Sequence, residues 1–201
     1  MRGAILISGR GSNMTALLEA AKAPDYPVDF RLVISNVPDA PGLATAGRFG
    51  VEAETIDHTG FDDRAAFESA LNARLEAADI ELVCLAGFMR ILSADFVGRW
   101  PDRLVNIHPS LLPAYKGLHT HERALAAGET THGCTVHLVR PAMDAGPILL
   151  QASVPVLADD KPDSLAARVL VREHEIYPQA VALLAGGGFE IDGDTVIRRS
   201  D

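Results

Sequence analysis

The chain has 201 residues, and 18 basic against 27 acidic side chains give it a formal net charge of −9. Hydrophobic residues make up 48% of the chain and charged residues 22%, the balance of an ordinary globular protein. Net acidity argues against nucleic acid as a partner, because phosphate backbones are bound by clustered Lys and Arg. The first apolar run, Ala4–Ile7, is too short for a signal sequence or a membrane span. Two cysteines, Cys84 and Cys134, are too few for a disulfide framework or a zinc knuckle. We therefore expect a soluble, cytoplasmic protein with no membrane partner.

Short apolar runs alternate with longer amphipathic stretches through the first half of the chain. The runs that predict strands are Ala4–Ile7, Phe30–Ser35, Val51–Ile56, Glu81–Ala86 and Leu104–His108. Helical spacing of apolar residues predicts helices over Asn13–Ala23, Pro41–Gly50, Asp62–Ala78 and Ser93–Trp100. Asp62 is the expected cap of the third helix. This alternation predicts an α/β fold with a doubly wound, mostly parallel, Rossmann-like sheet.

The pattern changes after His108. A loop over Pro109–Gly117, a helix over Thr120–Ala127, strands over His132–Val139 and Pro147–Val156, and a helix over Pro162–Ala185 follow. Pro178 should kink or break the last helix. Phe189–Ile197 reads as a hairpin around Asp192-Gly193, an antiparallel extension at the C-terminus. Without a linker or a repeat, we expect a single domain over residues 1–201, with an N-terminal part to about residue 108 and a C-terminal part over about 109–201.

A glycine-rich turn, Ser8–Asn13, follows the first predicted strand. Its glycines allow close approach of a ligand, and the helix start that follows presents free N–H groups to an anion. A dinucleotide fingerprint would need a third glycine at Met14 and an acidic residue after the second strand, which ends in Ser35-Asn36. A P-loop would need a lysine that is not there. A phosphate-binding turn and a purely structural turn both remain open.

The segment Asn106-Ile107-His108-Pro109 ends the fifth predicted strand. Residues two apart in a strand face the same side, so Asn106 and His108 project together. An amide donor beside an imidazole suits acyl transfer, because one can stabilise an oxyanion while the other moves protons. The alternative is that Asn106 caps a turn and His108 is a buried, hydrogen-bonded core residue.

Five histidines fall within thirty residues, and His119 with His121 form a pair that could bind a metal. Neither a Cys-x-x-Cys nor a His-Glu-x-x-His pattern completes a ligand set, so we expect no metal site. A metal-dependent hydrolase stays open as an alternative. Asp144 lies in a turn flanked by glycine and proline, and it would favour a charged imidazole if it were paired with His108.

Several segments together resemble the phosphoribosylglycinamide formyltransferases, a group of folate-dependent formyltransferases. The resemblance extends from residue 1 to about 190. It rests on segments in the expected order: Ser8–Asn13, Leu85–Ser93, Asn106–Pro113, Gly117–His121, Asp144–Ile148 and Glu173–Pro178.

The resemblance implies that a formyl group moves from 10-formyltetrahydrofolate to the amine of glycinamide ribonucleotide, giving tetrahydrofolate and formylglycinamide ribonucleotide in purine biosynthesis. Asn106 would then bind the oxyanion, His108 would be the general acid, and Asp144 would orient the imidazole and raise its pKa. The ribonucleotide would be held by Gly11, Ser12, Asn13 and Glu173. The folate would be held by Arg64, Met89, Arg90, Ile91, Leu92, Asn106, Arg140, Pro141, Ala142, Met143 and Asp144.

Related activities make different predictions. A formyltetrahydrofolate deformylase would carry an extra N-terminal domain, and a methionyl-tRNA formyltransferase would carry a C-terminal RNA-binding domain with a basic face. A non-catalytic module that binds folate or a nucleotide would lack the set of Asn106, His108 and Asp144. The length, the charge and the intact set favour the ribonucleotide formyltransferase, as a monomer or a homodimer.

Overall fold

The computed structural model describes residues 1–199. The chain forms two compact units, Met1–Val105 and Asn106–Asp201. The larger sheet has the strand order β3-β2-β1-β4-β5-β6-β7, and β8 and β9 form a separate two-stranded sheet. The fold is therefore α/β with a mostly parallel sheet and an antiparallel C-terminal extension, as the sequence predicts.

Four parallel strands form the sheet of the first unit, and three of them, β1, β2 and β4, are rich in buried apolar side chains. Its strands are β1 (Arg2–Ile7), β2 (Asp29–Ser35), β3 (Glu52–Thr55) and β4 (Leu82–Leu85). β1 pairs with β2 and β4, and β2 pairs with β3, all in parallel. Ile5, Leu6 and Ile7 are fully buried, as expected for strands that are covered on both faces.

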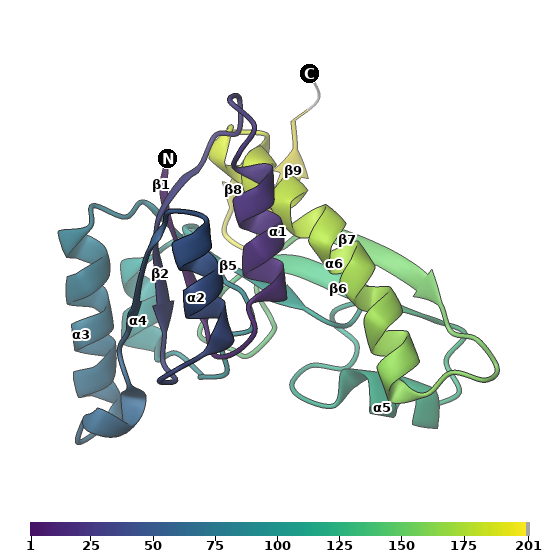
Figure 1. Cartoon of the computed structure of the whole chain (residues 1–201). Coiled ribbons are helices and arrows are strands. Elements are labelled where there is room, and N and C mark those ends of the chain that lie inside the picture. Colours follow the sequence, from purple (N-terminus) through teal and green to yellow (C-terminus); the bar gives the residue numbers. More distant parts are fainter. Residues whose placement is uncertain (200–201) are drawn as a thin grey trace. The chain divides into compact units, whose positions relative to one another are not determined.

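Helices cover both faces of these strands. They are α1 (Ser12–Ala20), α2 (Pro41–Arg48), α3 (Arg64–Ala77) and α4 (Ala94–Arg99), with a short 3₁₀ helix, η1, over His58–Gly60. In Figure 1, α1 and α2 lie to the right of the strands, and α3 and α4 lie to the left. The predicted cap of α3 was wrong by one residue, because the Asp63 side chain, and not that of Asp62, accepts the N–H of Ala66 at 2.8 Å.

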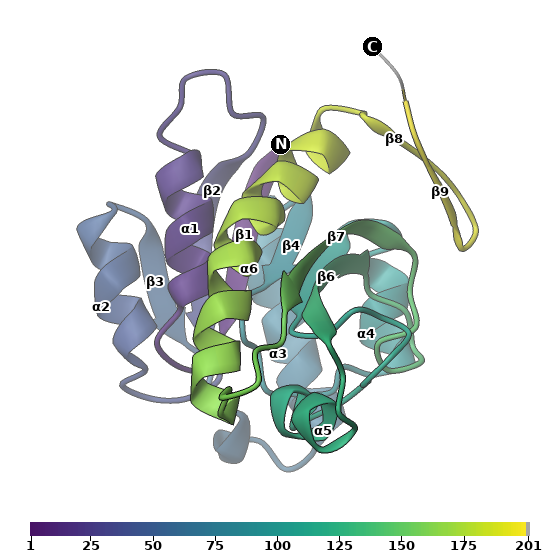
Figure 2. The ribbon, with the colours of Figure 1, turned by 90° about the vertical axis from the view of Figure 1, so that its right-hand side faces the viewer.

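The second unit is built on an antiparallel pair. The last three residues of β5 (Leu104–His108) belong to this unit, and α5 (Thr120–Ala126) follows in sequence. β6 (Thr131–Leu138) pairs antiparallel with β7 (Ile148–Pro155), and α6 (Pro162–Ala185) packs against both. β8 (Phe189–Asp192) and β9 (Thr195–Arg198) form the expected hairpin after α6 (Figure 2).

The long helix α6 has the predicted bounds and continues through Pro178 to Ala185, so the proline does not break it. A proline inside a helix costs about 3 kcal/mol. Tyr177 and Val181 beside it are fully buried, and burial of each such side chain contributes about 1.5–3 kcal/mol. Packing thus outweighs the local penalty. Among residues 1–199, no helix has both the length and the apolar character needed to cross a bilayer.

Candidate functional site

The carboxyl end of β5 carries Asn106 and His108, and the loop after it is anchored to β6. The Thr135 hydroxyl donates to the Ser110 carbonyl at 2.6 Å and accepts the Leu112 N–H at 3.0 Å. These bonds fix the direction in which the chain leaves His108.

The His108 ring has an acceptor on each side. Its Nε2 lies 3.0 Å from the Tyr115 carbonyl oxygen, and its Nδ1 lies 3.5 Å from Oδ2 of Asp144. A carbonyl oxygen can only accept, so Nε2 carries the hydrogen of this bond. A doubly protonated ring would find an acceptor at both nitrogens. The side chain is only 7% exposed, and such a setting strengthens each of these contacts.

Asp144 lies between two histidines. Its backbone is left-handed, with φ of 48°, and its Oδ2 accepts the Gly117 N–H at 2.8 Å. Its Oδ1 lies 3.8 Å from Nε2 of His137. The structure therefore brings the predicted residues Asn106, His108 and Asp144 into one cluster of the second unit, together with His137.

His137, one of the five histidines that fall within thirty residues of one another in the sequence, also belongs to this cluster. Burial is the largest cause that lowers its pKa, which favours the neutral ring. Its Nδ1 donates to the Leu138 carbonyl at 2.9 Å, so Nε2 of the neutral ring is an acceptor.

The acceptor on His137 determines how the Asn106 amide is oriented. Nδ2 of Asn106 lies 3.1 Å from Nε2 of His137 and donates to it. One amide N–H is thereby directed at His137, which leaves the second N–H to donate to a ligand. The position of His137 as the second histidine of the predicted strand His132–Val139 was the only sequence signal for this role.

Three further histidines of the second unit, His119, His121 and His132, have polar partners. Nδ1 of His121 lies 3.2 Å from Nε2 of His132, with the ring planes at 85°. His119 faces Glu122, 3.5 Å away. Within residues 1–199, no group of three or more His, Cys, Asp or Glu side chains could hold a metal ion.

The remaining predicted residues of the second unit lie on α6 and on the loop between β6 and β7. Glu173 is 7% exposed on α6. The Arg140 guanidinium contacts the turn between β8 and β9. The following residues, Pro141, Ala142 and Met143, are exposed.

In the first unit, the glycine-rich turn leads directly into α1. Gly11 is the N-cap, with a left-handed φ of 70°, and it has no side chain with which to cap the helix. Ser12 and Asn13 form the first turn, which contains no acidic residue. The helix start therefore presents backbone N–H groups, an arrangement that suits an anion.

The segment Met89–Leu92 follows β4 and is anchored at both ends. The Ser8 hydroxyl accepts the Met89 N–H at 2.7 Å, and the Glu68 carboxylate accepts the Ser93 N–H at 2.8 Å. Glu68 also lies 3.9 Å from Arg64, so one carboxylate ties Arg64 to the end of this segment. Met89 and Ile91 are each about two-thirds exposed.

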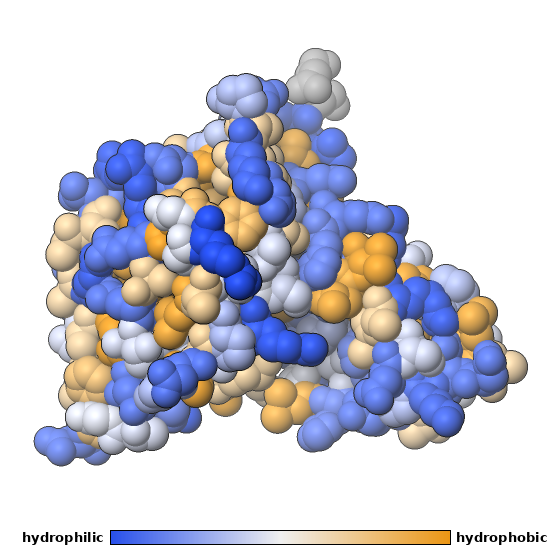
Figure 3. Space-filling model, in the orientation of Figure 1, coloured by the Kyte–Doolittle hydropathy of each residue, from blue (hydrophilic) through white to orange (hydrophobic). Residues whose placement is uncertain are grey.

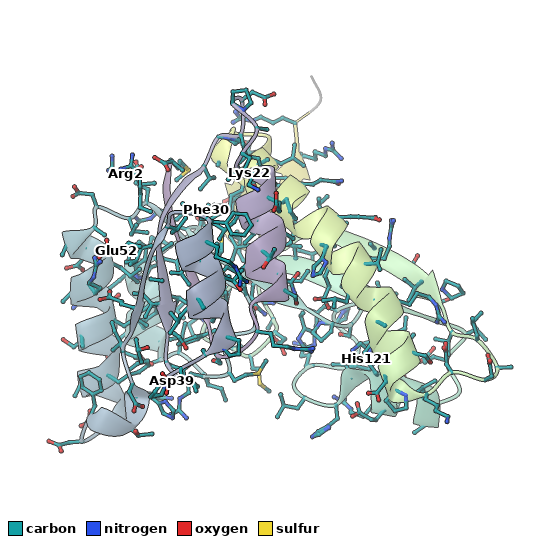
Figure 4. All side chains as sticks on the ribbon, viewed as in Figure 1. Arg2, Lys22, Phe30, Asp39, Glu52 and His121 are labelled. Atoms are coloured by element: carbon teal, nitrogen blue, oxygen red, sulfur yellow. The ribbon has the colours of Figure 1, made fainter. Side chains whose placement is uncertain are left out.

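A shallow hollow of about 250 Å³ lies elsewhere in the first unit, with Lys22 and Phe30 in its lining (Figure 4). It lies where β2 and β3 begin, whereas the glycine-rich turn follows the end of β1. The starts and the ends of parallel strands lie at opposite ends of the sheet, so the hollow is not the candidate site.

On the face drawn in Figure 3, apolar residues of the described chain form separate areas among hydrophilic ones.

The formyl transferase family model matches residues 1–181. The chain belongs to the formyl transferase family. Over 183 residues it is 46% identical to the phosphoribosylglycinamide formyltransferase of Escherichia coli K12, a match that covers 91% of this chain and 86% of the relative. It is 50% identical to the trifunctional purine biosynthetic protein adenosine-3 of Drosophila melanogaster, where the match covers 92% of this chain but only 14% of that protein.

Solved structures of similar proteins have the same fold as this chain. Glycinamide ribonucleotide transformylase 1 from Symbiobacterium toebii superposes with a TM-score of 0.97 at 44% identity, covering 100% of this chain and 94% of that one. A formyltetrahydrofolate deformylase from Burkholderia mallei is less similar, with a TM-score of 0.89 at 28% identity, covering 99% of this chain and 70% of that one.

Proposed function

We propose that this formyl transferase family member transfers the formyl group of 10-formyltetrahydrofolate to the amine of glycinamide ribonucleotide. The observation that carries the proposal is the cluster of Asn106, His108 and Asp144, in which a donor amide and an imidazole are held side by side in a nearly buried setting. The named relatives support this choice of substrates.

In the proposed reaction, the substrate amine attacks the formyl carbon, and charge builds on the formyl oxygen. The Asn106 N–H that does not face His137 would donate to this oxygen, as in an oxyanion hole. Protonated His108 would exchange its contact with the Tyr115 carbonyl for one with the reacting group. The C–N bond to the folate then breaks, the folate nitrogen takes up a proton, and the product amide nitrogen loses one.

Asp144 would act on His108 from the other side. Its Oδ2 already accepts the Gly117 N–H, so the carboxylate is fixed before any substrate arrives. It would keep the imidazole oriented and stabilise its charged form. The phosphate would be bound by Gly11, Ser12 and Asn13, and Glu173 would contact the ribonucleotide. The folate would be bound by Arg64, by Met89–Leu92 and by the loop that begins at Arg140 and ends at Asp144.

The test is an assay with 10-formyltetrahydrofolate in the presence and absence of glycinamide ribonucleotide. We expect tetrahydrofolate to appear only with the ribonucleotide, in equal amount to the formylated product. Release of tetrahydrofolate and formate without the ribonucleotide would show a deformylase instead. Saturable ligand binding without turnover would show a binding module.

We also infer a cytoplasmic location and a monomeric or homodimeric state for this formyl transferase family member. Cell fractionation and analytical ultracentrifugation test these two expectations. Recovery in a membrane fraction, or a larger assembly, would contradict them.

A further inference from the structure

The C-terminal hairpin, β8 and β9, lies beyond residue 181, where the family match ends. Its turn consists of Gly193 and Asp194, between the paired residues Asp192 and Thr195. The hairpin nevertheless contacts a loop that carries predicted site residues. That loop connects β6 to β7 and contains Arg140–Asp144.

The contact is made by one side chain, that of Arg140. Its Nη2 donates to the Gly193 carbonyl at 3.0 Å, and its Nε lies 3.3 Å from Oδ1 of Asp194. Its Nη1 lies 3.5 Å from the Val139 carbonyl oxygen. The planar guanidinium thus joins the first residue of the loop to the hairpin turn in a fixed geometry.

The far end of the loop is held independently. The Leu138 N–H donates to the Pro147 carbonyl at 2.9 Å, which closes the base of the loop. Gly146 lies so close to β6 that an added Cβ would be 1.8 Å from the Leu138 oxygen. Asp144 is bound by the Gly117 N–H. Between these anchors and Arg140, the residues Pro141, Ala142 and Met143 are exposed.

We propose that the hairpin turn positions the loop Arg140–Asp144 through Arg140, so that Arg140 is a positioning residue and not a direct ligand of the folate. This inference rests on the proposed function for its kinetic part only. With one anchor gone, residues 141–143 would sample more conformations, and the folate would have to order them again on binding. The expected kinetic effect is a higher KM for the folate with little change in kcat.

Hydrogen exchange of the ligand-free protein tests the positioning without relying on activity. In Arg140→Ala and Asp194→Ala, we expect amides in a peptide spanning residues 139–147 to exchange several-fold faster. Arg140→Lys should give an intermediate exchange rate, because lysine keeps the positive charge but lacks the several N–H donors of the planar guanidinium. Peptides from β6 and β7 should exchange at the original rate, which separates a local effect from general destabilisation.

The matched control is Glu190→Gln, in the same hairpin. Glu190 faces Arg199, 3.9 Å away, with both side chains 62% exposed, and within residues 1–199 no hydrogen bond or ion pair joins it to Arg140. We expect this variant to leave both the exchange of the loop and the KM unchanged. If Glu190→Gln increases the amide exchange rate of the loop as much as Asp194→Ala does, the claim that the contact with Arg140 positions the loop is refuted.

Kinetics then distinguish positioning from direct binding. We expect Asp194→Ala to raise the KM for 10-formyltetrahydrofolate about two- to fivefold, the range for an exposed charge pair, with kcat within twofold. If Arg140 bound the folate directly, Asp194→Ala would leave the KM unchanged or lower it, and loop exchange would not respond. That result would overturn the inference. If the protein does not formylate the ribonucleotide, the exchange data alone decide the positioning.

Discussion

The candidate site of the first unit is made of backbone groups, whereas that of the second unit is made of side chains. In the first unit, the candidate phosphate site is backbone at the start of α1, and the arginines Arg10 and Arg90 are exposed. In the second unit, the candidate chemistry depends on buried side chains, and the three buried histidines of residues 1–199 all lie there. Backbone N–H groups bind the same way at any pH, whereas a buried imidazole responds to its surroundings. Under the proposed function, the first unit would bind the phosphate through backbone groups, whereas the second unit would carry out the proton transfer through side chains.

The largest expected effect tests the second unit. His108→Ala should lower kcat by about 10²–10⁴, the range for loss of a general acid, because no other group donates from the same position between Asp144 and the Tyr115 carbonyl. The KM for the ribonucleotide should change little. Steady-state kinetics with both substrates provide the measurement.

Asp144→Asn is the matched variant, since it keeps the shape of the side chain and removes its charge. It should lower kcat with a similarly small change in the ribonucleotide KM, provided that circular dichroism shows an unchanged fold. Turnover at the original rate in either variant would mean that the cluster does not carry the chemistry.

The same contrast explains what the sequence could predict. In the first unit, β1 to β4 lie within two residues of their predicted ends. Apolar runs bounded by glycine and polar residues define the buried strands β1, β2 and β4, whereas β3 is a partly exposed edge strand. The cap of α3 was placed on Asp62 instead of Asp63 because two adjacent aspartates are equivalent in sequence. Only the backbone path distinguishes them.

In the second unit, the resemblance pointed to Asn106, His108 and Asp144, and the structure brings these side chains together. It gave no indication of His137 or of the Tyr115 carbonyl. Both depend on contacts between segments far apart in sequence: His137 reaches Asn106 from the neighbouring strand, and Tyr115 comes from a loop. The bounds of α6, Pro162–Ala185, were predicted correctly, but local propensity does not report the tertiary burial that keeps Pro178 from breaking the helix.

A smaller effect is expected from changing the first unit. In Gly11→Ala, the new side chain must adopt a left-handed backbone at φ of 70°, which costs about 1–2 kcal/mol. Its Cβ would also lie 3.1 Å from the Met14 side chain. If the turn shifts to relieve this strain, the KM for the ribonucleotide should rise about 5- to 30-fold, with kcat within about twofold. A fall in kcat with an unchanged KM would instead place chemistry in the first unit.

The smallest expected effect is the pH dependence of stability, which should come largely from the second unit. Burial is the largest cause that lowers the pKa of His121, His132 and His137 below the reference value of 6.5. Between the lowered values and 6.5, the unfolded chain binds more protons than the folded chain, so the free energy of unfolding must decrease as the pH falls through this window.

Urea unfolding at pH 7.5, 6.5 and 5.5 measures the slope of the free energy of unfolding against pH. His132→Gln keeps an N–H donor but cannot titrate, so it should flatten the slope even if it lowers stability overall. An unchanged slope in this variant would show that burial of His132 does not contribute, and would weaken the contrast between a backbone site in one unit and titrating side chains in the other.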